Sequence, residues 1–125
     1  QRLLAETGLE GRAQALAREL NLAEKRRLEL ARAVSAAPRL LLLDEPAGGM
    51  TPAETMAMAE TIRRVALPGR TVLIIEHKLD LIAALCQQLC VLNFGRKIGA
   101  GTPADVLREP QVLEAYLGQD ESDEV

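Results

Sequence analysis

The chain has 125 residues, of which 48% are hydrophobic and 26% charged, so it is long enough for one domain or for part of a larger one. Its formal net charge is −3, but four of its acidic residues lie in the last seven positions, Gln119–Val125. The remainder is nearly neutral and has no basic stripe, which argues against nucleic acid as a partner. No apolar run approaches the roughly 18 residues of a membrane-spanning helix.

Apolar periodicity and capping signals predict an alternation of helices and strands. In chain order we expect a helix end over 2–7, an ambiguous segment over 9–22, a helix over 23–37, a strand over 40–44, a loop at 48–49, a helix over 52–66, a strand over 71–76, a helix over 79–87, strands over 89–94 and 96–99, and helices over 103–108 and 110–117. This alternation predicts an α/β fold with at least two parallel strands.

The stretch Leu40–Pro46, with sequence LLLLDEP, is the most informative part of the chain. Four bulky aliphatic residues are typical of a strand that is buried on both faces of a parallel sheet. Such a strand delivers the next residues, Asp44 and Glu45, to the carboxyl edge of the sheet, where open α/β sheets bind ligands. One carboxylate there can hold Mg²⁺ and the other can activate a water, although two acids before Pro46 can also simply open a turn.

The segment Thr51–Glu54 predicts a helix start, because a hydroxyl cap is followed by proline and then by a glutamate three residues after the cap. Met58, Ile62 and Val65 then recur on one face of the helix, which indicates a core face.

The only histidine, His77, follows the second apolar strand. If the two strands are parallel neighbours, Asp44, Glu45 and His77 emerge at the same edge of the sheet. Three polar groups that converge there indicate a phosphate-handling site.

The two cysteines, Cys86 and Cys90, are four residues apart. This spacing fits neither a C-x-x-C redox pair nor half of a zinc site, so we expect two buried, reduced thiols in a cytosolic protein.

These motifs resemble, in the same order, the C-terminal half of the ATP-binding domain of ABC transporters. LLLLDEP resembles the Walker B strand, AGGMTPAE the D-loop and the helix after it, and LIIEH the strand with the switch histidine. The resemblance covers almost the whole chain, from Leu9 to Gly118, and implies a partial P-loop-NTPase-like sheet with flanking helices.

The resemblance also implies roles for individual residues. Asp44 matches the acid that holds Mg²⁺, and Glu45 matches the general base that activates the attacking water. His77 matches the switch residue that contacts the γ-phosphate of ATP. Gly48, Gly49 and the following Met50 match the D-loop, which faces the second ATP-binding subunit in a head-to-tail dimer.

Asn21–Glu24 occupies the place of the family's signature motif, LSGGQ, which binds the nucleotide of the opposing subunit. Asn21 stands for the serine, Leu22 and Ala23 for the two glycines, and Glu24 for the glutamine. A helix N-terminus binds phosphate through its backbone N–H groups and dipole, so we expect a divergent signature that still works.

The far end of the chain, RKIGAGTPADVLREPQVLEAYLG over Arg96–Gly118, resembles the C-terminus of ATP-binding subunits from branched-chain amino-acid importers. This resemblance implies ATP and Mg²⁺ as cofactors and transmembrane permease subunits as partners. It also implies a cytoplasmic location at the inner face of the cell membrane.

No G-x-x-x-x-G-K-[ST] P-loop occurs in the chain, so the cradle for the β- and γ-phosphates is missing. We therefore expect residues 1–118 to form the C-terminal part of an ATP-binding domain that is inactive alone, and residues 119–125 to form a flexible acidic tail. Two alternatives are a non-catalytic interaction or dimerisation fragment and the C-terminal lobe of a chromosome-maintenance or DNA-repair ATPase.

Overall fold

A computed structural model describes residues 1–120, with side chains up to Gly118. Its elements are α1 (Arg2–Glu6), the 3₁₀ helices η1 (Glu10–Arg12) and η2 (Ala17–Glu19), α2 (Leu22–Ser35), β1 (Leu40–Asp44), α3 (Pro52–Val65), β2 (Thr71–Ile75), α4 (Leu79–Leu85), β3 (Leu89–Asn93), β4 (Arg96–Gly101), α5 (Pro103–Val106) and α6 (Pro110–Asp120). The predicted α/β order is confirmed, and the ambiguous segment before α2 forms the two short 3₁₀ helices. The chain divides into two compact units, Gln1–Leu81 and Ile82–Val125.

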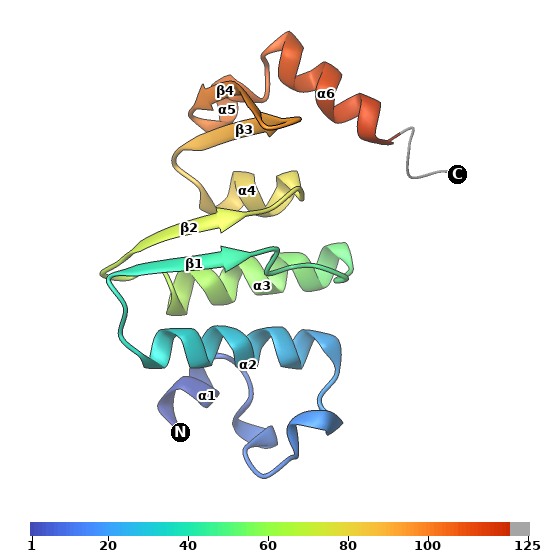
Figure 1. Cartoon of the computed structure of the whole chain (residues 1–125). Coiled ribbons are helices and arrows are strands. Elements are labelled where there is room, and N and C mark those ends of the chain that lie inside the picture. Colours follow the sequence, from blue (N-terminus) through green and yellow to red (C-terminus); the bar gives the residue numbers. More distant parts are fainter. Residues whose placement is uncertain (121–125) are drawn as a thin grey trace. The chain divides into compact units, whose positions relative to one another are not determined.

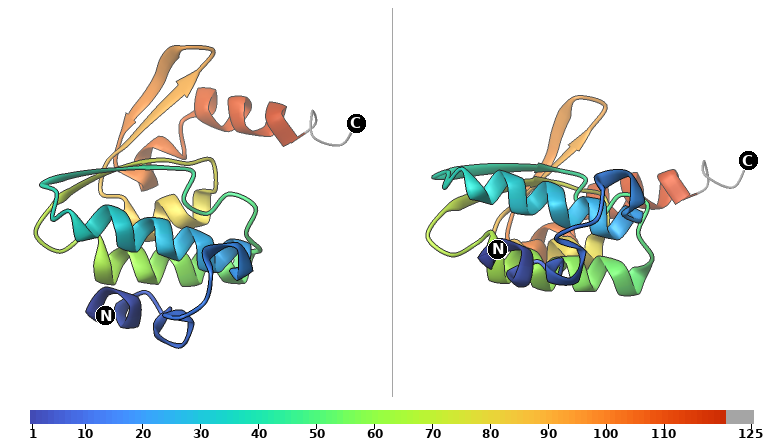
Figure 2. Two further views of the ribbon diagram at one scale, coloured as in Figure 1. Left: turned by 60° about the horizontal axis from the view of Figure 1, so that its bottom comes forward. Right: turned by 90° about the horizontal axis from the view of Figure 1, so that it is seen from below.

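The first unit is built on a parallel pair of strands, β1 and β2 (Figure 1). Their register places Leu40 opposite Thr71 and Asp44 opposite Ile75. The two strands therefore end together, and the loops that follow them leave from the same edge. Helices α2 and α3 lie side by side against one face of this pair (Figure 2).

Within the first unit, Gln1–Leu81, only one face of the parallel pair is covered. Leu41 is buried, whereas Leu40, Leu42, Leu73 and Ile75 are all more than half exposed. The prediction that the leucine run is buried on both faces is therefore wrong within the unit Gln1–Leu81. The strands alternate between a covered and an uncovered face, as their period of two residues requires.

Helix α3 follows its sequence signals closely. The Thr51 side chain accepts a hydrogen bond from the Glu54 N–H, and the Glu54 carboxylate accepts one from the Thr51 N–H, so the predicted capping box is present. Met58, Ile62 and Val65 are buried, which confirms the predicted core face.

The second unit contains an antiparallel hairpin, β3–β4, and the helices α5 and α6. The turn residues Phe94 and Gly95 both have positive φ angles, 47° and 75°. Val106 of α5 and Val112 of α6 pack closely against Gly99 of β4, where a Cβ atom would come within 3.2 Å of them. These contacts hold the two helices on the hairpin.

The predicted acidic tail starts inside α6, which extends to Asp120. Residues 121–125 lie outside the described part of the chain. Over residues 1–120, no helix is both long and apolar enough to cross a membrane.

The cysteines correct another expectation. Both are free thiols, but Cys90 on β3 is exposed and Cys86, just after α4, is only partly covered. They are not buried because Cys86 follows the end of its helix and Cys90 lies on the uncovered side of the hairpin, where β3 alternates between partly covered and exposed residues.

Candidate functional site

The chain turns abruptly where β1 ends. Asp44 is the last residue of the strand and is exposed, and Glu45 follows with a positive φ angle of 46°. The Glu45 N–H donates to the Ile75 carbonyl over 2.8 Å, so the turn is anchored to the end of β2. Left-handed conformations of residues that carry a Cβ atom are uncommon and gather at functional sites.

His77 lies beside Glu45 at this edge. Its Nδ1 atom is 3.7 Å from the Glu45 Oε1 atom, and the two side chains are 65% and 56% exposed. The distance is longer than a hydrogen bond, so the two groups are electrostatic neighbours that share access to solvent. The structure thus brings Glu45 and His77 together, with Asp44 as the residue before Glu45.

A third acid at this edge, Glu76, is absent from the sequence-based set of site residues. Its side chain is 0% exposed and lies 3.4 Å from His77 Nδ1. Its carboxylate accepts hydrogen bonds from the backbone N–H groups of His77, Lys78 and Ala47, at 2.9, 3.3 and 3.4 Å. The alternation of β2 could have revealed it, because residue 76 continues the covered face that Val72 and Ile74 occupy.

Lys78 is a second polar residue that the sequence reading did not single out. Its ammonium donates to the carbonyls of Ala47 and Met50, at 2.8 and 2.7 Å, and to the Thr55 hydroxyl at 3.2 Å. It therefore joins the segment after β2 to the loop between β1 and α3. No local sequence pattern predicts these partners, because they lie more than twenty positions earlier in the chain.

The predicted signature segment, Asn21–Glu24, forms the start of α2. The Asn21 side chain accepts from the Glu24 N–H, and the Glu24 carboxylate accepts from the Asn21 N–H, both at 2.9 Å. Glu24 also forms an ion pair with Arg12 at 3.2 Å. The negative charge that Glu24 brings to the helix start therefore has a cationic partner.

The start of α2 and the loop after β1 lie against each other. A Cβ atom placed on Gly49 would come within 2.8 Å of the Leu22 side chain, and one on Gly48 within 3.5 Å of the Arg26 guanidinium. Close approach therefore favours glycine at position 49, where the φ angle is also positive, at 76°. The structure places parts of the predicted signature and of the predicted D-loop next to each other.

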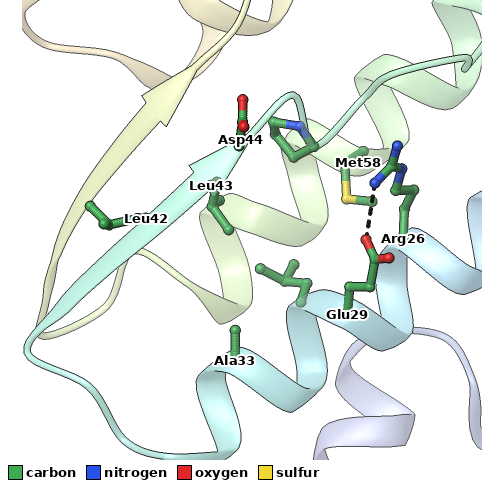
Figure 3. Close-up of a pocket in the computed structure, with 9 residues that line it drawn as sticks. Arg26, Glu29, Ala33, Leu42, Leu43, Asp44 and Met58 are labelled. Carbon is green, nitrogen blue, oxygen red and sulfur yellow. Dashed lines mark hydrogen bonds and ion pairs between the residues drawn. The ribbon is translucent and has the colours of Figure 1, made fainter.

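A pocket of about 170 Å³ lies beneath the end of β1, between α2 and α3. Figure 3 shows Leu43 pointing into it and the ion pair of Arg26 with Glu29 at its side. Asp44 lies at its rim, but Glu45 and His77 do not line it. The polar chemistry of this chain therefore resides on the exposed edge of the sheet rather than in this pocket.

Asp44 fits one ligand of a Mg²⁺ ion. Within residues 1–120, no three His, Cys, Asp or Glu side chains are grouped to hold a metal by themselves. Mg²⁺ usually takes only one or two protein carboxylates and completes its shell with phosphate oxygens and waters. A single exposed carboxylate at the end of a strand suits that arrangement and not a metal cage made by protein alone.

Curated proteins match this chain over most of its length. It is 37% identical over 117 residues to "High-affinity branched-chain amino acid transport ATP-binding protein LivG" of Escherichia coli K12, which is 93% of this chain and 46% of the relative. BraF of Pseudomonas aeruginosa, with the same description, is 39% identical over 97 residues, 77% of this chain and 38% of the relative. The lipopolysaccharide export system ATP-binding protein LptB of Escherichia coli is 33% identical, over 94% of this chain and 49% of the relative. The chain thus spans less than half the length of these curated relatives.

Solved structures and a family model give the same assignment. The ADP conformation of MJ1267, an ATP-binding cassette of an ABC transporter, superposes with a TM-score of 0.83 and 29% identity, over 94% of this chain and 48% of that one. A nucleotide-free ATP-binding cassette gives a TM-score of 0.82 with 28% identity, over 92% and 47%. The family model "Branched-chain amino acid ATP-binding cassette transporter" matches residues 96–122. The chain therefore belongs to the ATP-binding proteins of ABC transporters, and the predicted resemblance to the branched-chain amino-acid group is confirmed.

Proposed function

We propose that this chain supplies the hydrolytic edge of an ATP-binding subunit in an ABC importer, with branched-chain amino acids as the cargo. The observation that carries the proposal is the 3.7 Å approach of His77 to Glu45 at the end of the parallel pair. Glu45 is exposed and free to accept a proton from a water, which is what a general base must do. The relatives support a transport-coupled role because LivG and BraF are ATP-binding proteins of branched-chain amino-acid transport.

In the proposed dimer, each residue has one task. Asp44 would hold the Mg²⁺ of a bound nucleotide, Glu45 would accept the proton of a water, and His77 would contact the γ-phosphate beside Glu45. Gly48 and Gly49 face the second ATP-binding subunit. The start of α2, Asn21–Glu24, meets the nucleotide that the second subunit holds, through the N–H groups of Leu22 and Ala23, which lie outside the capping box of Asn21 and Glu24.

The partners follow from this assignment. A second ATP-binding subunit completes each nucleotide site. Transmembrane permease subunits bind at the inner face of the membrane, and ATP hydrolysis drives their conformational change. The similarity to LptB supports a second candidate, an export system, as the user of the same ATPase. The branched-chain group is favoured because the family model that matches residues 96–122 is specific to it.

The test uses two proteins: the 125-residue chain, and a fusion in which the portion of the Escherichia coli relative before the matched region precedes Gln1. We expect the chain alone to show no Mg-dependent ATPase activity, because it has no P-loop. We expect the fusion to hydrolyse ATP, and Glu45→Gln to lower its kcat by about 10²–10⁴-fold while ATP binding persists.

Glu114→Gln is the matched control, because Glu114 is an exposed glutamate on α6. We expect this variant to keep the activity of the fusion. Full activity of the Glu45→Gln fusion would contradict the role of Glu45. Activity of the 125-residue chain that disappears with Glu45→Gln would contradict its inactivity alone. An inactive but ATP-binding fusion would favour the non-catalytic interaction fragment.

A further inference from the structure

The Lys78 ammonium uses all three of its N–H donors within the protein. It donates to the Ala47 carbonyl, the Met50 carbonyl and the Thr55 hydroxyl, at 2.8, 2.7 and 3.2 Å. An ammonium group has three donors, so its hydrogen-bonding capacity is filled. A lysine at the surface normally leaves its donors to water, whereas this one directs two of them to a single loop and the third to the Thr55 hydroxyl in the first turn of α3.

That loop, Ala47–Met50, contains two adjacent glycines and closes on itself. The Met50 N–H donates to the Ala47 carbonyl at 3.1 Å, and the Gly48 N–H donates to the Glu45 carbonyl at 3.0 Å. The two carbonyls that Lys78 binds are those of the first and last residues of the loop. Glycine-rich backbone has the largest conformational entropy to lose, so outside contacts decide how well such a loop is ordered.

The residues on both sides of His77 hold Ala47. The Glu76 carboxylate accepts from the Ala47 N–H, and the Lys78 ammonium donates to the Ala47 carbonyl. Both backbone polar groups of Ala47 are thus bound by neighbours of the histidine. A displacement of the segment 76–78 must pull on the loop, and a displacement of the loop must pull on that segment.

We propose that Lys78 is a positioning residue that ties the histidine segment to the Ala47–Met50 loop and so fixes how Gly48 and Gly49 face the second subunit. The consequence for hydrolysis rests on the function proposed above. The coupling of the two segments does not, because it is a property of this chain alone.

The coupling is tested on the 125-residue chain by amide hydrogen exchange with residue resolution. Lys78→Met keeps the aliphatic stem and removes the three donors. We expect exchange at Gly48 and Met50 to accelerate by about tenfold or more, while the amide of Ile62 in the core of α3 changes by less than about twofold. Lys78→Arg, which retains donors, restores part of the protection.

Lys25→Met is the matched control, because Lys25 is exposed on α2. It leaves exchange at Gly48 and Met50 unchanged. The proposal is overturned if Lys78→Met leaves these two amides unaffected, or if it accelerates Ile62 by the same factor, since a uniform change would mark a loss of global stability only.

The consequence for hydrolysis is tested in the fusion described above. We expect Lys78→Met to lower kcat by about tenfold with the KM for ATP within about twofold, because the loop is misplaced while the nucleotide cradle is intact. An unchanged kcat would overturn the catalytic part. A fusion that is inactive even with Lys78 present would count against the proposed function, and the exchange result would still decide the coupling.

Discussion

Glu45 combines an unusual backbone with an unusual position. Its φ angle of 46° is in the left-handed region, and its N–H is bound to the end of β2. A left-handed residue with a Cβ atom costs on the order of 1–3 kcal/mol, which the surrounding contacts must offset. This backbone conformation turns the chain sharply after β1, and the Glu45 carboxylate lies beside His77 as a result.

The covered carboxylate of Glu76 differs from Glu45 in its surroundings. Its side chain is fully covered and receives three backbone N–H groups, whereas more than half of the Glu45 side chain is exposed. A buried carboxylate requires such donors because it has lost its water. The Glu76 carboxylate therefore binds the backbone of the loops that follow β1 and β2, and Glu45 is the carboxylate that is accessible to water.

The two cysteines offer a test of local burial. Burial raises the pKa of the Cys86 thiol, whereas Cys90 is exposed. Alkylation proceeds through the thiolate. A raised pKa lowers the fraction of Cys86 that is thiolate at a given pH, so Cys86 reacts more slowly. At pH 8 we expect iodoacetamide to modify Cys90 about tenfold faster than Cys86, and the Cys86 rate to keep rising at higher pH.

Mass spectrometry of the single variants Cys86→Ser and Cys90→Ser reports each thiol separately. Unfolding the chain in denaturant is the control, because it should make the two rates equal. Equal rates in the folded protein would show that Cys86 is as accessible as Cys90.

At the scale of elements, the loop between β1 and α3 depends on the helix beside it. Gly49 has a φ angle of 76°, and a Cβ atom there would come within 2.8 Å of the Leu22 side chain. Gly49→Ala should therefore lower the free energy of unfolding by about 1–3 kcal/mol, mainly from backbone strain, because the half-exposed Leu22 side chain can turn away from the new methyl group. Urea denaturation measures this change.

Gly11→Ala is the matched control, because a Cβ atom on Gly11 would meet nothing within 4 Å. It should be neutral or stabilising by up to about 1 kcal/mol. Leu22→Ala combined with Gly49→Ala separates the two causes, since it removes the overpacking and keeps the strain. A Gly49→Ala variant as stable as Gly11→Ala would contradict the expected strain at position 49.

The sequence was a good guide where the signals are local. Thr51, Pro52 and Glu54 predict the start of α3 correctly, because a capping box and a proline at the first helical position act within one helical turn. The signals failed for the sheet, since a run of leucines shows that a strand is apolar but not what covers its two faces. They failed also for Lys78, whose partners are fixed by the pairing of β1 with β2 and not by neighbouring residues.

At the scale of the whole chain, the uncovered face of the parallel pair departs from an ordinary surface. Its four apolar residues are Leu40, Leu42, Leu73 and Ile75, which are 56%, 64%, 56% and 60% exposed. Parallel sheets are normally covered on both faces. Within the unit Gln1–Leu81 this sheet is covered on one face, so the outer face should bind apolar probes.

Leu42 and Leu73 are direct partners across the two strands, so together they form the centre of this face. The double variant Leu42→Ser, Leu73→Ser should lower the fluorescence of bound ANS by roughly half, since it removes the centre of a contiguous apolar patch. The far-ultraviolet circular dichroism should be unchanged, because neither side chain is part of the buried core. The control is Leu16→Ser with Met56→Ser, which removes two apolar side chains that are 51% and 42% exposed on separate segments. Because scattered apolar side chains do not form a probe site, this control should leave the fluorescence nearly unchanged, and an equal loss in both variants would mean that the sheet face is not the binding surface.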